Sequence, residues 1–176
     1  VLNANNGTEE STSLELTFDV ETALPKNTFT KAGYTFKEWN TNRNGERKSY
    51  ADEEVVKNIT STNNTIVNLY AIWEPITYNV KFVNKTSEQY YDIPNGVKYT
   101  EEITLSKPSN FTKEGYTFVG WSTSEGSNTV TYTPGQKVSG LTATNNATVR
   151  LYAVWTANTY TIKFNANGGS GTMSDL

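Results

Sequence analysis

The chain has 176 residues, a formal net charge of −3 and a pI near 5.1, and it contains neither histidine nor cysteine. The missing residue types exclude Ser-His-Asp triads, cysteine nucleophiles, disulfides and the usual zinc sites. The acidic balance argues against nucleic acids and anionic membrane surfaces as partners, because both require clustered Lys and Arg. No apolar run is long enough to predict membrane insertion, and the start at Val1 has no signal-peptide pattern.

The first part of the chain predicts short strands separated by turns. Val1 and Leu2 are predicted to end a first strand, because the Asn-Ala-Asn-Asn-Gly run at 3–7 resembles the Asn-Ala-Asn-Gly-Gly run that follows a strand pattern at 165–169. Residues 52–57 are predicted to add a helical turn.

The second part follows the same plan more completely. Tyr78, Val80 and Phe82 share one side of a predicted half-buried strand. Residues 100–105 predict a short helix, with a threonine N-cap and acidic residues in its first turn. Residues 148–155 carry apolar groups on both faces, which is typical of a central strand covered on both sides.

Internal repetition is the strongest pattern in the chain. The Gly-Tyr-Thr-Phe run at 33–36 returns at 115–118, and the Leu-Tyr-Ala-x-Trp run at 69–73 returns at 151–155. Each copy stands 82 residues after its original, which indicates tandem copies of one folding unit. We therefore predict repeat units at 1–74 and 75–156 and the start of a third at 157–176, in a piece of a longer protein.

The repeated runs also carry a family resemblance. Gly-Tyr-Thr-Phe-x-Gly-Trp at 115–121, Leu-Tyr-Ala-x-Trp, and Tyr-x-Ile-x-Phe-Asn-Ala-Asn-Gly-Gly at 160–169 together resemble the Listeria–Bacteroides repeat family, which includes the B repeats of internalin B. The resemblance implies compact β-rich modules of the β-grasp type on the surface of Gram-positive and related bacteria. The expected fold is mainly β, with α+β as the alternative: two tandem β-grasp-like modules, each a small mixed sheet with at most a short helix. The resemblance implies no catalytic residue, cofactor or metal.

One position departs from the family motif. Glu38 stands in the first copy where the second copy has Gly120. A glycine at this point permits a bulge or a close backbone approach. We therefore expect a looser or differently turned strand in the first copy.

Most of the repeated apolar positions are predicted to form the two cores, because each copy of a module needs the same packing. A sugar-stacking platform is the alternative for the aromatic members. Tyr90 and Tyr91 have no counterpart in the first copy and are the expected exposed pair and the candidate ligand contacts. The predicted core residues are Tyr34, Phe36, Trp39, Leu69, Trp73, Val80, Phe82, Tyr116, Phe118, Trp121, Leu151 and Trp155.

Three further kinds of site are weighed against ordinary surface. The carboxylates at 52–54 and at 101–102 are adjacent in sequence, which is typical of a solvated face rather than of a glycosidase pair. The run at 42–46 lacks the spaced acids of a calcium loop and predicts a turn. Lys81 and Lys163 point outward by alternation, which argues against a buried isopeptide crosslink.

These patterns favour a non-catalytic role outside the cell. The expected function is a stalk or spacer on the bacterial cell wall that presents a distal adhesive domain, with neighbouring repeats as partners and stiff junctions such as the one at Pro75. The alternative is an adhesin module that contacts a host protein or glycan through loops 41–50 and 122–128, which differ between the copies.

The last predicted strand has no module behind it. Tyr160, Ile162 and Phe164 share one face of this strand, and an isolated strand of this kind does not normally stay ordered in water. We expect it to complete the first repeat unit of a neighbouring molecule by β-augmentation. The alternative is that it pads the second unit of its own chain.

Overall fold

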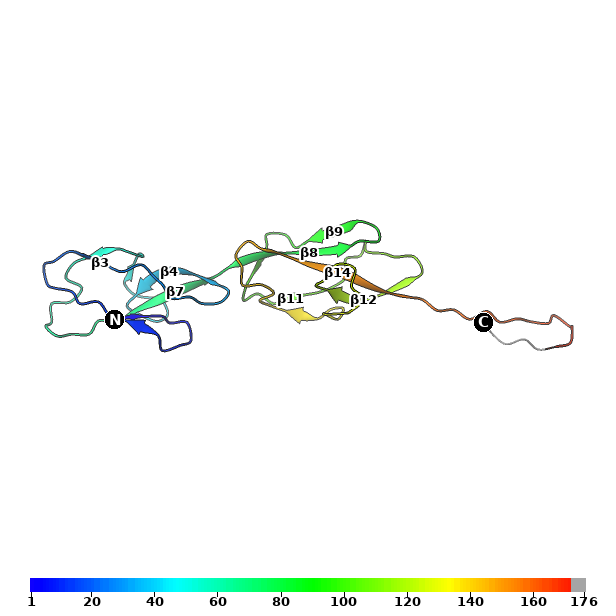
Figure 1. Cartoon of the computed structure of the whole chain (residues 1–176), viewed down its shortest axis with the longest axis horizontal. Coiled ribbons are helices and arrows are strands. Elements are labelled where there is room, and N and C mark those ends of the chain that lie inside the picture. The colour runs from blue at the N-terminus through cyan, green and yellow to red at the C-terminus, as the bar shows by residue number, and fades with distance from the viewer. Residues whose placement is uncertain (172–176) are drawn as a thin grey trace. The chain divides into compact units, whose positions relative to one another are not determined.

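The computed structural model describes residues 1–171, and Figure 1 shows the course of the chain. Regular structure in this range consists of strands, without any helix. The expected mainly β fold with small mixed sheets is therefore confirmed. The strands are β1 (Leu2–Asn3), β2 (Ser11–Thr12), β3 (Thr22–Ala23), β4 (Tyr34–Asn40), β5 (Ser49–Tyr50), β6 (Val55–Val56), β7 (Leu69–Pro75), β8 (Thr77–Asn84), β9 (Gln89–Asp92), β10 (Val97–Lys98), β11 (Ile103–Thr104), β12 (Tyr116–Ser122), β13 (Lys137–Val138) and β14 (Thr148–Ala157).

The chain divides into two compact units by its contacts. These units are defined by contacts within the structure, whereas the repeats are defined by the sequence. The two divisions are therefore not equivalent, and the predicted repeat boundaries at 74 and 156 stay predictions. Residues 172–176, the end of the predicted third repeat, lie outside the described residues. The first unit contains Val1–Asn79, Pro94–Ile103 and Val138–Val149, and the second contains Val80–Ile93, Thr104–Lys137 and the described residues from Arg150 onward.

The first sheet has the strand order β2-β1-β7-β4-β5. β1 runs parallel to β7, with Leu2 opposite Leu69, and β4 runs antiparallel to β7. Because side chains alternate along a strand, Leu69 and Ala71 turn to the same side. Both are buried in one cluster with Leu2 and Trp39, which forms the core of the first unit.

The second sheet has the strand order β10-β8-β14-β12, with β9 also paired to β8. Alternation along β8 buries Tyr78, Val80 and Phe82, whose exposed fractions are 0%, 0% and 3%. β12 and β14 are antiparallel, with Phe118 opposite Trp155. Two small two-stranded sheets, β3 with β6 and β11 with β13, complete the described pairing.

We expected the strand at Glu38 to be looser or differently turned than the strand at Gly120, but both strands contain the same β-bulge. The ladder shifts register between Phe36 and Glu38 in β4, and it shifts in the same way between Phe118 and Gly120 in β12. The bulge in β4 forms although Glu38 does not have a positive φ, whereas Gly120 in β12 has a φ of 149°. A Cβ on Gly120 would lie 2.5 Å from the carbonyl oxygen of Tyr132, so glycine is needed for this close approach rather than for the bulge.

Both predicted helical segments are strands or turns. Residues 100–105 contain β11, and Ile103 and Leu105 are both buried. Residues 52–57 contain β6, where Val56 is buried and pairs with Thr22 of β3. Segments this short cannot hold a helix by local propensity, so the burial of alternate side chains decides their structure.

The predicted core residues differ in burial. Tyr116 is exposed, contrary to its predicted place in the core. It is the first residue of β12, and the Lys113 ammonium group lies 3.6 Å from the centre of its ring. Trp39, Leu69, Val80, Phe82, Trp121 and Leu151 are buried, and Tyr34, Phe36, Trp73, Phe118 and Trp155 are partly buried.

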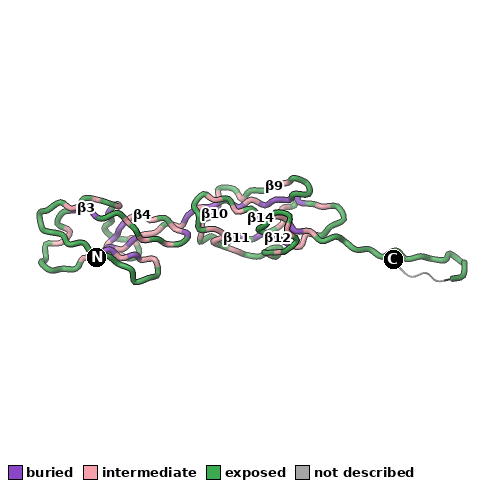
Figure 2. Tube along the Cα trace, viewed as in Figure 1, coloured by how far each residue is buried: buried purple, intermediate pink, exposed green. Residues whose placement is uncertain are grey.

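The segment that follows β14 is exposed over residues 158–171, as Figure 2 shows in green. Residues 160–164 form no strand within the described chain. No described strand pairing joins this segment to the second unit, so the alternative in which it pads that unit is not what the structure shows.

Candidate interaction surfaces

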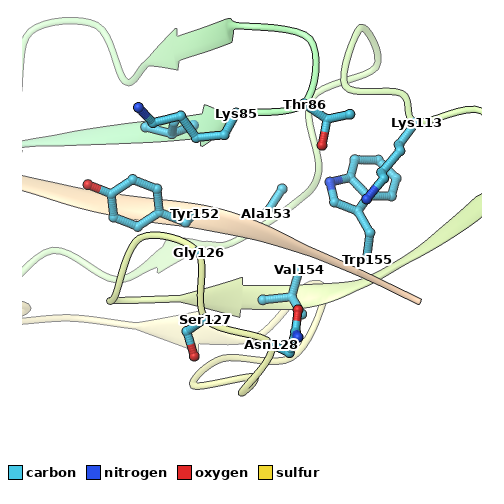
Figure 3. Close-up of a pocket in the computed structure, with 11 residues that line it drawn as sticks. Lys85, Thr86, Lys113, Gly126, Ser127, Asn128, Tyr152, Ala153, Val154 and Trp155 are labelled. Atoms are coloured by element: carbon cyan, nitrogen blue, oxygen red, sulfur yellow. The ribbon is translucent and has the colours of Figure 1, made fainter. Parts of the chain in front are cut away.

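A shallow pocket lies on the second unit, over the strands β8 and β14 and the loop at 126–128. Its volume is about 140 Å³. Figure 3 shows Lys85 and Thr86 on one side, Tyr152 and Trp155 on β14, and Ser127 and Asn128 opposite. The pocket is lined by Val83, Lys85, Thr86, Lys113, Gly126, Ser127, Asn128, Tyr152, Ala153, Val154 and Trp155.

Trp155 and its first-copy counterpart Trp73 differ in their hydrogen bonding. Trp73 Nε1 donates to the carbonyl oxygen of Ala4 at 2.8 Å. Trp155 Nε1 is buried and has no hydrogen-bond partner among the described residues. A buried N–H group without a partner costs free energy, so the second copy carries an unmet donor at a place where the first copy is satisfied.

An ion pair stands beside the pocket. Lys85 Nζ lies 2.7 Å from Glu125 Oε1, and both side chains are about half exposed. The hydrogen bond from Lys85, followed by its charge and a hydrogen bond from Tyr152, lowers the pKa of Glu125 despite partial desolvation, and the same bond to Glu125 raises the pKa of Lys85. Solvent screens such a pair, so we read it as a positioning contact for Lys85 and not as a major source of stability.

Lys85→Met is expected to move the pKa of Glu125 upward toward its ordinary value, because it removes the main hydrogen bond to the carboxylate. A carboxyl group whose pKa is lowered by folding stabilises the fold above its ordinary pKa, and this contribution is lost as the pH falls through the lowered value. Carbon-detected NMR titration of Glu125 measures the change. Lys81→Met is the matched control, because Lys81 pairs with Asp92 at 3.7 Å instead. An unchanged pKa of Glu125 in Lys85→Met would contradict the assignment.

The two candidate ligand contacts lie in different places. Tyr90 is exposed and lines a second shallow hollow with Lys81, Lys85, Glu125 and others, next to the pocket. The ammonium group of Lys81 lies 5.5 Å from the centre of the Tyr90 ring. Tyr91 is also exposed, but its ring packs against Phe82 at 6.1 Å and does not line either hollow.

The structure brings forward two residues that the sequence did not single out, Lys85 and Lys113. They line one pocket together with Tyr152, which the sequence offers as a member of the aromatic set that could stack on a sugar. The sequence held one signal: Glu125 stands where the first copy has Arg43, whose guanidinium lies 5.1 Å from the centre of the Tyr70 ring. Within the described part of the chain, no group of three or more acidic side chains is arranged to hold a metal ion.

A second feature is the buried connection at Ile76, which lies between β7 and β8 and within the first compact unit. Its N–H donates to the Gly33 carbonyl oxygen at 3.0 Å, and its own carbonyl oxygen accepts the Tyr99 N–H at 2.9 Å. Gly33 has a φ of 78°, and a Cβ there would overlap the Tyr99 ring. Tyr99 also packs edge-on against Tyr34, with ring centres 5.9 Å apart, so the segment that joins the two copies is held from both sides.

Comparisons with known proteins place the chain among repeats. The model of the Listeria-Bacteroides repeat domain matches twice, at residues 2–72 and 78–154. Two proteins of Evansella cellulosilytica, one named as a Gly-rich membrane protein and the other as a membrane protein, are 30% and 32% identical over 141 residues. These matches cover 80% of this chain but only 16% and 18% of the relatives. Within the described residues, no helix has the length and apolar character to cross a membrane.

Proposed function

Since the chain belongs to the Listeria-Bacteroides repeat family, we propose that it is part of a non-catalytic spacer in a bacterial surface protein. In this role the tandem modules hold a distal adhesive domain away from the cell wall. The long relatives named as membrane proteins support a surface context. The aromatic residues support a structural role, since Trp39 and Trp121 are buried in the cores and are not arranged as an exposed platform.

The connection at Ile76 carries the proposal. β7 ends at Pro75 and β8 begins at Thr77, so a single residue separates the two strands. Ile76 is buried, and both of its backbone groups are hydrogen-bonded. A spacer needs a junction without a flexible linker, and proline in the connection restricts the backbone further.

The backbone at residues 74–78 is expected to be as rigid as the strands. Order parameters from 15N relaxation should be about 0.85 there, as in regular structure. Inserting Gly-Ser-Gly after Ile76 should lower them, whereas the same insertion after Gly126, in an exposed loop, should leave them unchanged. Values below about 0.6 in the unaltered chain would contradict the spacer proposal.

A binding role is the second candidate, and the pocket beside Trp155 favours it. The loop at 126–128 that lines the pocket differs in sequence between the copies, and such loops are where specificity for a host protein or glycan would lie. A glycan and host-protein array probed with the chain and with Tyr152→Ala separates the roles. Binding that Tyr152→Ala abolishes would favour the adhesin, and an array without binders would favour the spacer.

A further inference from the structure

One position explains why the pocket on the second unit is open. The Asn-Ala-Asn run at 3–5 returns at 165–167, and the repeat period of 82 residues places Lys85 at the position of Asn5. The short amide of the first copy is therefore replaced by a long cationic side chain in the second copy, at the edge of the pocket.

In the first copy this amide closes the surface. Asn5 Nδ2 donates to the carbonyl oxygens of Ala71 at 2.9 Å and of Arg43 at 3.0 Å, so it ties β7 to the neighbouring loop. Among the described residues, Lys85 makes no such bond, because its ammonium group forms the ion pair described above. Ala153, the counterpart of Ala71, lines the pocket instead.

Positive charge gathers around the pocket. A second hollow adjoins it and shares Lys85 and Tyr152 with it, so the two form one continuous surface. Among the described residues that line this surface, the cations outnumber the acids. Such a surface attracts a negatively charged ligand, although the whole chain is acidic. The lining cations are Lys81, Lys85, Lys113 and Arg150, against Glu125 as the acidic member.

Aromatic rings and neutral polar groups complete the surface. Tyr152 and Trp155 line the pocket, and Tyr90 lines the adjoining hollow. Figure 3 shows Ser127 and Asn128 across from Lys85. Flat aromatic rings beside hydroxyl and amide groups suit a sugar ring, which packs its C–H groups on the aromatic face and forms hydrogen bonds through its hydroxyl groups.

The unmet indole N–H of Trp155 indicates where an anionic group would sit. Trp155 and Lys113 lie at the same end of the pocket (Figure 3). Trp155 Nε1 is covered in the free protein, so a ligand oxygen reaches it when a flexible lining side chain such as Lys113 turns aside. A carboxylate at this point accepts bonds from both groups and satisfies a donor that otherwise has no partner.

From these observations we infer that the pocket binds a hexuronic acid residue of an acidic polysaccharide. Its carboxylate lies beside Lys113 and the Trp155 N–H, its ring lies against Tyr152, and the next sugar of the chain lies in the hollow at Tyr90. This inference deepens the binding role, the second candidate function, and rests on it. The spacer role does not depend on it.

NMR titration of the four tryptophan indole N–H groups tests the site directly. A glucuronate-containing tetrasaccharide of hyaluronate, or one of bacterial teichuronic acid, should move the Trp155 signal downfield, and the tighter ligand identifies a host or a cell-wall source. Binding should weaken as salt is added. Trp39 Nε1 is also buried without a partner but lies in the core of the first unit, so its signal should stay in place.

A matched pair of variants tests the role of Lys113. Lys113→Met should weaken binding about tenfold, because a charge-assisted bond is lost, and Lys113→Arg should retain binding. Lys31 is the first-copy counterpart, and it contacts the Tyr34 ring as Lys113 contacts the Tyr116 ring. Lys31→Met should therefore bind like the unaltered chain.

Neutral chitotetraose separates the inference from the binding role. Equal movement of the Trp155 signal with this tetrasaccharide would overturn the uronic acid assignment and leave a glycan-binding role standing. A Trp155 signal that neither acidic ligand moves, or equal affinity of Lys113→Met and Lys31→Met, would overturn the site itself.

Discussion

Trp121→Ala is expected to lower the free energy of unfolding by about 3–5 kcal/mol, the usual range for truncating a buried aromatic residue. Trp121 is fully buried, and its ring lies 4.6 Å from Phe82 and 4.9 Å from Phe118 between centres. Its Nε1 donates to the Leu105 carbonyl oxygen at 3.0 Å, so the substitution also removes a buried hydrogen bond. Urea unfolding followed by tryptophan fluorescence and circular dichroism measures the loss.

Tyr116→Ala is the matched control for Trp121→Ala, because Tyr116 lies on the same strand and is exposed. Its effect should stay below about 1 kcal/mol. If the two variants lost equal stability, Trp121 would not be the centre of the core, and the sugar-platform reading of the aromatic set would gain support.

The second large effect is expected at Gly120. Gly120→Ala places a Cβ within 2.5 Å of both the Tyr132 carbonyl oxygen and Val130 Cγ1, at a φ that side chains rarely adopt. Overpacking of this kind costs about 1–3 kcal/mol, and the hydrogen bond from the Trp121 N–H to the Tyr132 carbonyl oxygen, 2.8 Å long, would be strained. Thermal and urea unfolding measure the change.

Glu38→Gly is the reciprocal control in the first copy. The bulge at Glu38 forms without a positive φ, so glycine brings no conformational relief there. It should cost only about 0.5–1 kcal/mol through added flexibility of the unfolded chain. A Gly120→Ala variant as stable as the unaltered chain would show that residues 130–132 move away without penalty.

The strands with clear alternation could be predicted from sequence, and segments that depend on distant partners could not. Apolar and polar side chains alternate along β8 and β14, and the sequence pattern of each strand occurs twice in the chain. Residues 100–105 carry local helix signals, yet Leu105 is buried and exchanges backbone hydrogen bonds with the segment at 135–136. Tertiary pairing therefore overrides the local signal, and nothing within six residues reveals the partner.

The candidate pocket was harder to predict than the fold. Lys85, Lys113 and Tyr152 are far apart in sequence, and only the packing of β8, β14 and the adjoining loops brings them together. Metal-binding and nucleophile motifs can be recognised by a fixed spacing of residues along the sequence. The three pocket residues have no such spacing. Tyr90 stands out in the sequence because it is unique to the second copy, and the difference between Arg43 and Glu125 marks one member of the neighbouring ion pair in the same way.

The parallel pairing of β1 with β7 has a mechanical consequence. β1 is the first strand of the first repeat and β7 is the last strand before the connection to β8. Traction on the two ends of the repeat pulls parallel neighbours in opposite directions along their axes. The hydrogen bonds across such a ladder are perpendicular or slanted to this pull, so they bear load together and do not unzip one after another. Under tension, the rupture rate of the module would be governed by the sheared hydrogen bonds between β1 and β7.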